Sequence, residues 1–242
     1  MSTAEQIQGQ VEGKGPFISS HSRAQWVTAL LLIVILIDVL AVIFDFSQIG
    51  LLSRAQAGIP VSEAEAVAND SRQAMMGFIY FAAFIVTAIV FCLWIHRAHR
   101  NLPALGARDL KYSPTWAVGG FFVPILSLYR PYQVTKEIWK ASDPNEGPDW
   151  QDAPTSSLIG WWWVTFIASS YAGYILLRMS LSAETISDFM SLSVMTLVTD
   201  IIDIPAAILA IILVRTIDQR QTMKNQQMFS TSNPQGINVR SI

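Results

Sequence analysis

Three aspartates lie in apolar surroundings where a carboxyl group needs compensation. Asp38 interrupts an apolar run near the N-terminus, and Asp200 and Asp203 interrupt another near the C-terminus. An acidic side chain at the centre of a membrane helix costs about 2.5–3.5 kcal/mol on insertion scales. Since Asp200 and Asp203 are three residues apart, they share a helix face. This pattern indicates a proton or cation site in which at least one carboxyl is protonated.

A second interpretation of the three aspartates is structural. Protonated carboxyls can hydrogen-bond to neighbouring helices and hold them together without any transport. Asp38 and Asp200 each lie 14 residues from the inner end of their expected helix, which places both at a depth of about 21 Å. The hydroxyl side chains within reach in this interpretation are Tyr80, Thr87, Thr196 and Thr199.

The sequence around Asp200 and Asp203 does not favour an enzyme. Asp-x-x-Asp resembles the opening of phospholipid head-group transferases, but Ile204 stands where glycine is expected and no later aspartate pair follows. The Gly-x-Gly-Asp context of intramembrane aspartyl proteases is missing as well. No phosphate-binding loop, serine nucleophile motif or His-Glu-x-x-His pattern occurs. We therefore expect no enzymatic activity, no catalytic residue and no cofactor.

A group of cationic residues follows the second apolar run. His96 and His99 have the spacing of a ligand pair, but two imidazoles without carboxylate or thiolate partners make a weak metal site, and we expect none. Arginines alternate with the histidines, which is typical of a basic collar that contacts phosphate headgroups. The expected headgroup or interface residues are His96, Arg97, His99, Arg100, Arg130, Lys136 and Lys140.

The composition is that of a membrane protein. Of 242 residues, 52% are hydrophobic and only 14% are charged, whereas globular domains carry about 25% charged residues. The formal net charge of -2 gives no reason to expect nucleic acid as a partner. The expected partners are the lipid bilayer and other membrane proteins or further copies of this chain.

Four apolar runs reach the roughly 20 residues that a spanning helix needs. Because backbone groups in lipid must be satisfied internally, we predict an all-α integral membrane protein with four transmembrane helices. Lysines and arginines number 13 on the side of the termini and three on the other side, which places both termini in the cytoplasm. The expected spans cover about residues 24–46, 73–95, 156–177 and 189–214.

A shorter apolar stretch, residues 116–129, does not fit a span. Its 14 residues make about 21 Å of helix against a hydrocarbon core of about 30 Å, and Pro124 disrupts helical hydrogen bonding. We expect a short broken helix that is re-entrant or interfacial on the cytoplasmic side. Ser113 followed by Pro114 predicts its start.

An amphipathic helix is predicted from Pro131 to Ser142. The apolar side chains fall on one face and the charged ones on the other, as in a helix at the membrane surface. The apolar face comprises Val134, Ile138 and Ala141, and the charged face comprises Lys136, Glu137 and Lys140. The re-entrant or interfacial part therefore covers residues 114–142 of a membrane domain at 24–214, flanked by polar tails at 1–22 and 221–242 that we expect to be disordered in the cytoplasm.

Several motifs in the inner loop resemble the bacterial membrane proteins grouped as domain of unknown function 4328. The resemblance covers roughly residues 94–162 and implies a multi-pass protein of the bacterial inner membrane with no established activity. It carries over no catalytic residue. The motifs are Arg97-Ala98, Arg100-Asn101-Leu102, Leu105-Gly106, Tyr112-Ser113-Pro114, Trp116-Ala117-Val118-Gly119, Phe122-Val123-Pro124-Ile125, Arg130-Pro131-Tyr132-Gln133-Val134 and Ile138-Trp139.

Two functions remain open from the sequence. The first is a non-enzymatic scaffold or accessory subunit with lipid or protein contacts through residues 96–142. The second is a small proton or cation transporter or channel that uses the three aspartates.

Overall fold

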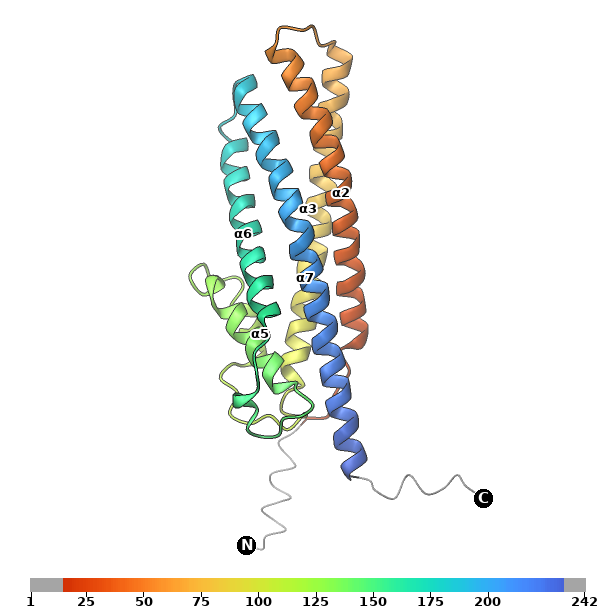
Figure 1. Ribbon diagram of the computed structural model, residues 1–242, viewed down its shortest axis with the longest axis vertical. Helices are drawn as coiled ribbons and strands as arrows, with labels where there is room; N and C mark the ends of the chain where they lie inside the picture. The colour runs from red at the N-terminus through yellow and green to blue at the C-terminus, as the bar shows by residue number, and fades with distance from the viewer. Residues whose placement is uncertain (1–14, 233–242) are drawn as a thin grey trace, which may run out of the picture. The chain divides into compact units, whose positions relative to one another are not determined.

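The computed structural model describes residues 15–232, and every regular element within them is helical (Figure 1). Three helices are long and apolar enough to cross a membrane: α2 (His21–Gln56), α3 (Glu63–Arg100) and α7 (Ile186–Ser232). The remaining elements are α4 (Pro114–Gly119), η1 (Leu126–Leu128), α5 (Arg130–Ala141), η2 (Trp150–Asp152) and α6 (Ser157–Ser180).

The prediction of four spans needs correction, because three helices qualify and not four. The fourth predicted span, residues 156–177, does form a helix, the 24-residue α6. Although α6 carries no charge before Arg178, it is rich in amphipathic and small polar side chains, which lower its mean hydropathy. These are Trp161, Trp162, Trp163, Ser169, Ser170, Tyr171 and Tyr174.

The chain divides into two compact units, each assembled from separated segments. We call residues 26–90 and 160–212 the membrane unit, because they hold most of the apolar helical sequence. We call the described residues 15–25, 91–159 and 213–232 the loop unit. Helices α2, α3, α6 and α7 contribute residues to both units.

The membrane unit exposes many large apolar side chains and buries several acidic ones. Its four helical segments run lengthwise beside one another (Figure 1). Large apolar side chains such as Phe78 and Phe81 are 74% and 63% exposed, whereas Asp38 is fully buried. Because lipid does not drive apolar side chains inward, this distribution suits a unit surrounded by lipid tails.

The short helix predicted after Ser113 is present as α4. The Ser113 hydroxyl accepts a hydrogen bond from the N–H of Trp116 at 3.3 Å, and Pro114 is the first helical residue. The helix ends at Gly119, and only the short 3-10 helix η1 follows before α5. The stretch 116–129 is therefore not one continuous helix, and its re-entrant or interfacial placement stays a prediction.

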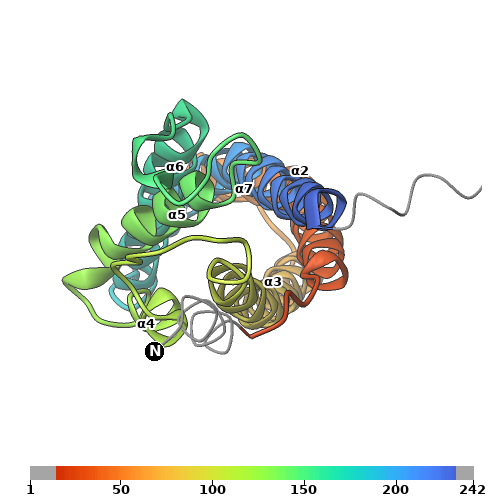
Figure 2. The same cartoon turned by 90° about the horizontal axis from the view of Figure 1, so that it is seen from below.

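The amphipathic helix is present as α5, seen in Figure 2. Val134, Ile138 and Ala141 are all fully buried, so this face of α5 packs within the loop unit, and a position at the membrane surface stays a prediction. Glu137, which we expected on the solvated face, is only 4% exposed. That expectation is wrong, because Glu137 pairs with a buried histidine described below.

Helix α7 extends much further than its apolar run. It continues to Ser232, so residues 221–232, expected to be disordered, are helical. The reason is a buried stripe along this part of α7 that packs within the loop unit: Leu213, Ile217, Gln221 and Lys224. Residues 1–14 and 233–242 lie outside the described residues.

Two adjacent glycines at the end of α4 should differ sharply in their tolerance of a side chain. A Cβ on Gly120 would lie 2.6 Å from Cγ of Arg130, whereas a Cβ on Gly119 would meet Trp116 at an ordinary 3.5 Å. We expect Gly120→Ala to destabilise the protein by about 1–3 kcal/mol through overpacking. Gly119→Ala is the matched control, and thermal unfolding in detergent should show a lower Tm only for Gly120→Ala. Equal Tm values would contradict this packing.

Candidate functional sites

The three predicted acids are all buried in the membrane unit. The exposed fractions are 0% for Asp38, 8% for Asp200 and 7% for Asp203. Asp38 lies on α2, and it interacts electrostatically with Asp200 and Asp203 on α7. The structure therefore brings the three carboxyls into one cluster.

Asp203 has hydrogen-bond donors on two other helices. The Tyr80 hydroxyl on α3 donates to its Oδ2 at 2.8 Å, and the Ser169 hydroxyl on α6 donates to its Oδ1. Both carboxyl oxygens of Asp203 are thereby satisfied. Tyr80 was one of the expected partners, but Ser169 was not. The three expected threonines donate instead to carbonyls of their own helices, as do many membrane hydroxyls: Thr87, Thr196 and Thr199.

Asp45 is a fourth member that the sequence analysis missed. It is 3% exposed and is hydrogen-bonded to Asp200 and Gln73. A hydrogen bond between two carboxyls requires a proton on one of them, because ionised carboxylates only accept. Asp45 follows Asp38 by seven residues, two helical turns, so their shared face was the signal that could have revealed it.

Asp38 has no hydrogen-bond partner on either carboxyl oxygen. In the membrane unit, all of whose residues the structure describes, no ion pair joins any of the four acids to a basic side chain. The basic residues of this unit are Arg54, Arg72 and Arg178. None of these three arginines therefore serves as a counter-ion to the four acids.

His99 is not a headgroup contact. It is 1% exposed, and its Nε2 lies 2.9 Å from Oε1 of Glu137. The other oxygen of Glu137 accepts the Lys111 backbone N–H at 2.7 Å. The predicted collar therefore loses one member, because His99, the last residue but one of α3, faces α5 and not the surface.

The neighbouring cationic residues do gather, and Arg23 joins them. His96, Arg97 and Arg100 on α3 repel one another and Arg23 on α2. The Arg23 guanidinium donates to the Leu93 carbonyl at 3.0 Å, which holds it beside α3. No ion pair links these four side chains to an acid in the described part of the chain.

The cationic residues around α5 are engaged within the loop unit. The Arg130 guanidinium lies 4.9 Å from the ring centroid of Tyr112, and Lys140 donates to the Gln151 carbonyl at 2.7 Å. Lys136 is half-buried on the same helix. Arg130, Lys136 and Lys140 are therefore not part of the cationic group formed by Arg23, His96, Arg97 and Arg100.

A buried polar network fixes the loop unit around α7. Gln221 is fully buried and donates to the Ala98 carbonyl at 2.8 Å and to the Ser142 hydroxyl at 3.1 Å. Lys224 donates to the Ala141 carbonyl at 2.9 Å. Burial lowers the pKa of Lys224, while Asp143 and Glu146 act in the opposite direction. The sequence analysis assigned this segment to a tail and missed the network.

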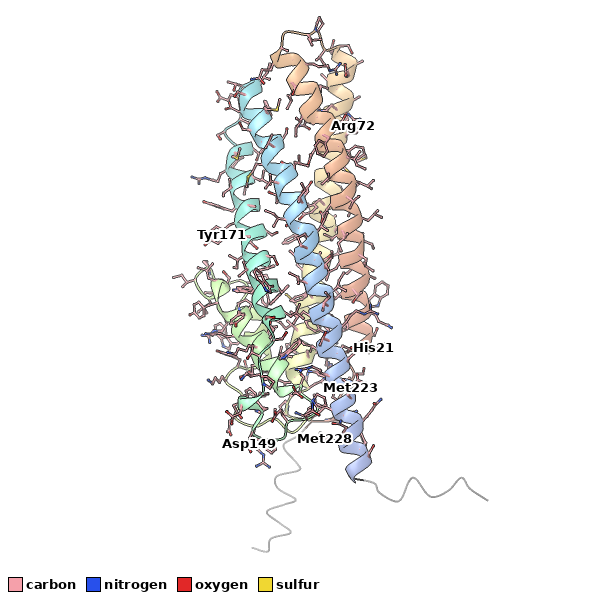
Figure 3. The ribbon with its side chains drawn as sticks, viewed as in Figure 1. His21, Arg72, Asp149, Tyr171, Met223 and Met228 are labelled. Atoms are coloured by element: carbon pink, nitrogen blue, oxygen red, sulfur yellow. The ribbon has the colours of Figure 1, made fainter. Side chains whose placement is uncertain are left out.

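The start of α2 is held to the same stretch of α7. Asp218 accepts a hydrogen bond from the Ser20 hydroxyl at 3.1 Å and lies 2.7 Å from Nδ1 of His21, which is labelled in Figure 3. Polar contacts thus bind α2, α3, α5 and α7 into one loop unit.

These features define an all-helical protein with three helices suited to crossing a membrane. The chain belongs to the family described as Domain of unknown function (DUF4328), whose model matches residues 57–219, more than half of the chain. The resemblance seen in the sequence is thereby confirmed. The matched range includes Asp200 and Asp203 but begins after α2, which carries Asp38 and Asp45. Neither curated proteins nor solved structures yield a match.

The buried pair of His99 on α3 and Glu137 on α5 should contribute to the stability of the protein. Glu137→Ala removes the partner of His99 Nε2 and of the Lys111 N–H, and a buried group left without its partner costs about 1–3 kcal/mol. We expect a lower Tm for Glu137→Ala and for His99→Ala, and a double variant less destabilised than the sum. The control is Asp149→Asn at an exposed acid. Strictly additive effects would show that the pair is not coupled.

Proposed function

We propose that the protein is a non-enzymatic scaffold or accessory subunit of the bacterial inner membrane. The observation that carries this proposal is an exposed apolar segment in the loop unit. Trp116, Phe122 and Ile125 are 54%, 73% and 74% exposed, respectively. Exposed apolar patches of this kind mark membrane or protein contacts. The apolar segment 116–129 is therefore the proposed contact surface.

Positive charge beside this segment supports lipid as one partner. The ring of Phe121 lies 6.0 Å from that of Phe91 on α3, which places the apolar segment next to the helix that carries His96, Arg97 and Arg100. Apolar side chains with adjacent cationic groups suit an interface with anionic headgroups. Other membrane proteins or a second copy of the chain are the proposed protein contacts.

We further propose that α6 crosses the membrane with α2, α3 and α7, so that both termini lie in the cytoplasm. The 24 residues of α6 make about 36 Å of helix, enough for the hydrocarbon core. The hydrogen bond from Ser169 to Asp203 supports this placement, because it joins α6 to α7 within the membrane unit. The distribution of lysines and arginines supports the orientation.

A small proton or cation transporter is the second candidate function. The observation that favours it is Asp38, fully buried without a hydrogen-bond partner among three other acids. Carboxyl groups inside a membrane domain commonly mark ion or proton pathways. Proton or cation flux in proteoliposomes, compared with an Asp38→Asn variant, tests this candidate.

The proposed topology predicts which loops an impermeant maleimide can reach. Single cysteines at Ala57, Ser182 and Lys136 are introduced into a Cys92→Ser background, since Cys92 is the one native cysteine. In intact cells we expect labelling of Ala57→Cys and Ser182→Cys, and labelling of Lys136→Cys only after permeabilisation. If Ser182→Cys, like Lys136→Cys, is labelled only after permeabilisation, then α6 does not cross the membrane.

The scaffold proposal predicts contacts at Phe122 in cells. A benzophenone amino acid replaces Phe122, and another replaces the exposed Asp149 as a matched control. After irradiation we expect adducts with lipid, with another membrane protein or with a second copy at position 122, and few at position 149. Equal adduct yields at both positions would reject the apolar segment as a contact surface.

A further inference from the structure

Four carboxyl groups on two helices of the membrane unit share one buried region, yet only two of them are directly hydrogen-bonded to each other. We propose that Asp45 and Asp200 form a proton-binding site in which one proton is shared between the two carboxyls, with Asp38 as a second protonation site two turns away. This inference names the proton as the ion of the proposed transporter. Proton binding at the pair does not require transport, and only the predicted proton flux rests on the transport function.

The Asp45–Asp200 pair has the composition of a single-proton site. One carboxyl must donate for the hydrogen bond to exist, so the pair holds at least one proton, and with one proton it carries a single negative charge. A second ionisation would place two charges in contact in a poorly solvated region, which like-charge repulsion opposes. Gln73 on α3 lies close enough to Asp45 to interact with its carboxyl. The Oδ2 atoms of Asp45 and Asp200 have no partner, so each pair member keeps an oxygen free to accept.

The unpartnered carboxyl of Asp38 is a second, independent observation that indicates proton binding in this region. It is fully buried with both oxygens unpartnered, and it interacts electrostatically with Asp200. A buried polar group without partners is destabilising, and more so when it is charged. Binding a proton removes that charge. Seven residues separate Asp38 from Asp45, which is about 10 Å along α2.

The other titratable groups of the region keep distinct roles. Asp203 accepts from Tyr80 and Ser169 with its two oxygens, so its hydrogen bonds are already satisfied in the ionised form. On α3, Arg72, labelled in Figure 3, is held by Asn69 and lies over the Phe44 ring at 5.7 Å. Helix α6 carries no charged residue before Arg178, and its Tyr171 is 52% exposed.

The ligand set favours a proton over a metal cation. Metal cations such as calcium and magnesium take six or more oxygen ligands. Among the described residues, no three acidic, histidine or cysteine side chains lie close enough together to hold a metal ion. A proton needs only the two oxygens that the Asp45–Asp200 pair already brings together.

A hydrophobic carbodiimide tests the site, because dicyclohexylcarbodiimide modifies protonated carboxyls in apolar surroundings. The full-length protein in lipid vesicles is treated at neutral pH and the adducts are mapped by peptide mass spectrometry. We expect adducts at Asp45 or Asp200 and not at the exposed Asp70. Asp45→Asn should reduce modification of Asp200 several-fold, because an Asn amide can donate to an ionised Asp200. Asp70→Asn is the matched control and should leave the pattern unchanged.

Infrared spectroscopy gives a second readout that does not depend on reagent access. The wild-type protein should show a protonated-carboxyl C=O band at neutral pH that is weaker in the Asp45→Asn/Asp200→Asn double variant, in which the pair no longer contributes. Absence of both the band and the adducts in the wild type would overturn the proposal. Unchanged modification of Asp200 in Asp45→Asn would also overturn it, because the proton would then not depend on the pair.

Proton flux separates this inference from the transport candidate. A protonated pair without flux in wild-type proteoliposomes supports the binding site and rejects transport. Flux without a protonated carboxyl at Asp45 or Asp200 rejects the binding site and leaves transport standing. Flux that Asp38→Asn and Asp200→Asn each abolish, together with the adducts, supports both.

Discussion

Desolvation of carboxyl groups is the constraint on which the membrane unit depends. Apolar side chains gain nothing from packing against one another in lipid, so the contacts that distinguish one helix arrangement from another are polar. Here Asp203 joins α7 to α3 and α6, and the Asp45–Asp200 pair joins α2 to α7. The acids thus link α2, α3, α6 and α7 through polar contacts within the membrane unit.

Much of the fold could be predicted from periodicity and helix-capping chemistry. The long apolar helices, the start of α4 at Ser113 and the buried face of α5 all follow from local sequence. The extent of α7 could not be predicted in this way, because the polar residues of its last turns are buried only by partners distant in sequence, such as Ala98 and Ser142 for Gln221. Helix α6 was predicted to span the membrane because it lacks charged residues, but its mean hydropathy is too low for it to qualify. Absence of charge is therefore a weaker sign of a spanning helix than a high content of apolar residues.

The candidate sites were only partly visible in the sequence for the same reason. Asp38, Asp200 and Asp203 stood out because each interrupts an apolar run, whereas Asp45 lies near the end of such a run and its role depends on a partner on α7. His99 was assigned to the surface because its neighbours are arginines, and only the packing of α5 brings Glu137 to it. Pairings between distant elements are tertiary information that residue type and spacing do not contain.

The partners of the Asp45–Asp200 hydrogen bond are separated by 155 residues. During synthesis, α2 is therefore complete long before the segment of α7 that contacts it exists. The contact between Asp45 and Asp200 is consequently a late event in folding, and a chain truncated before Asp200 would leave Asp45 without it.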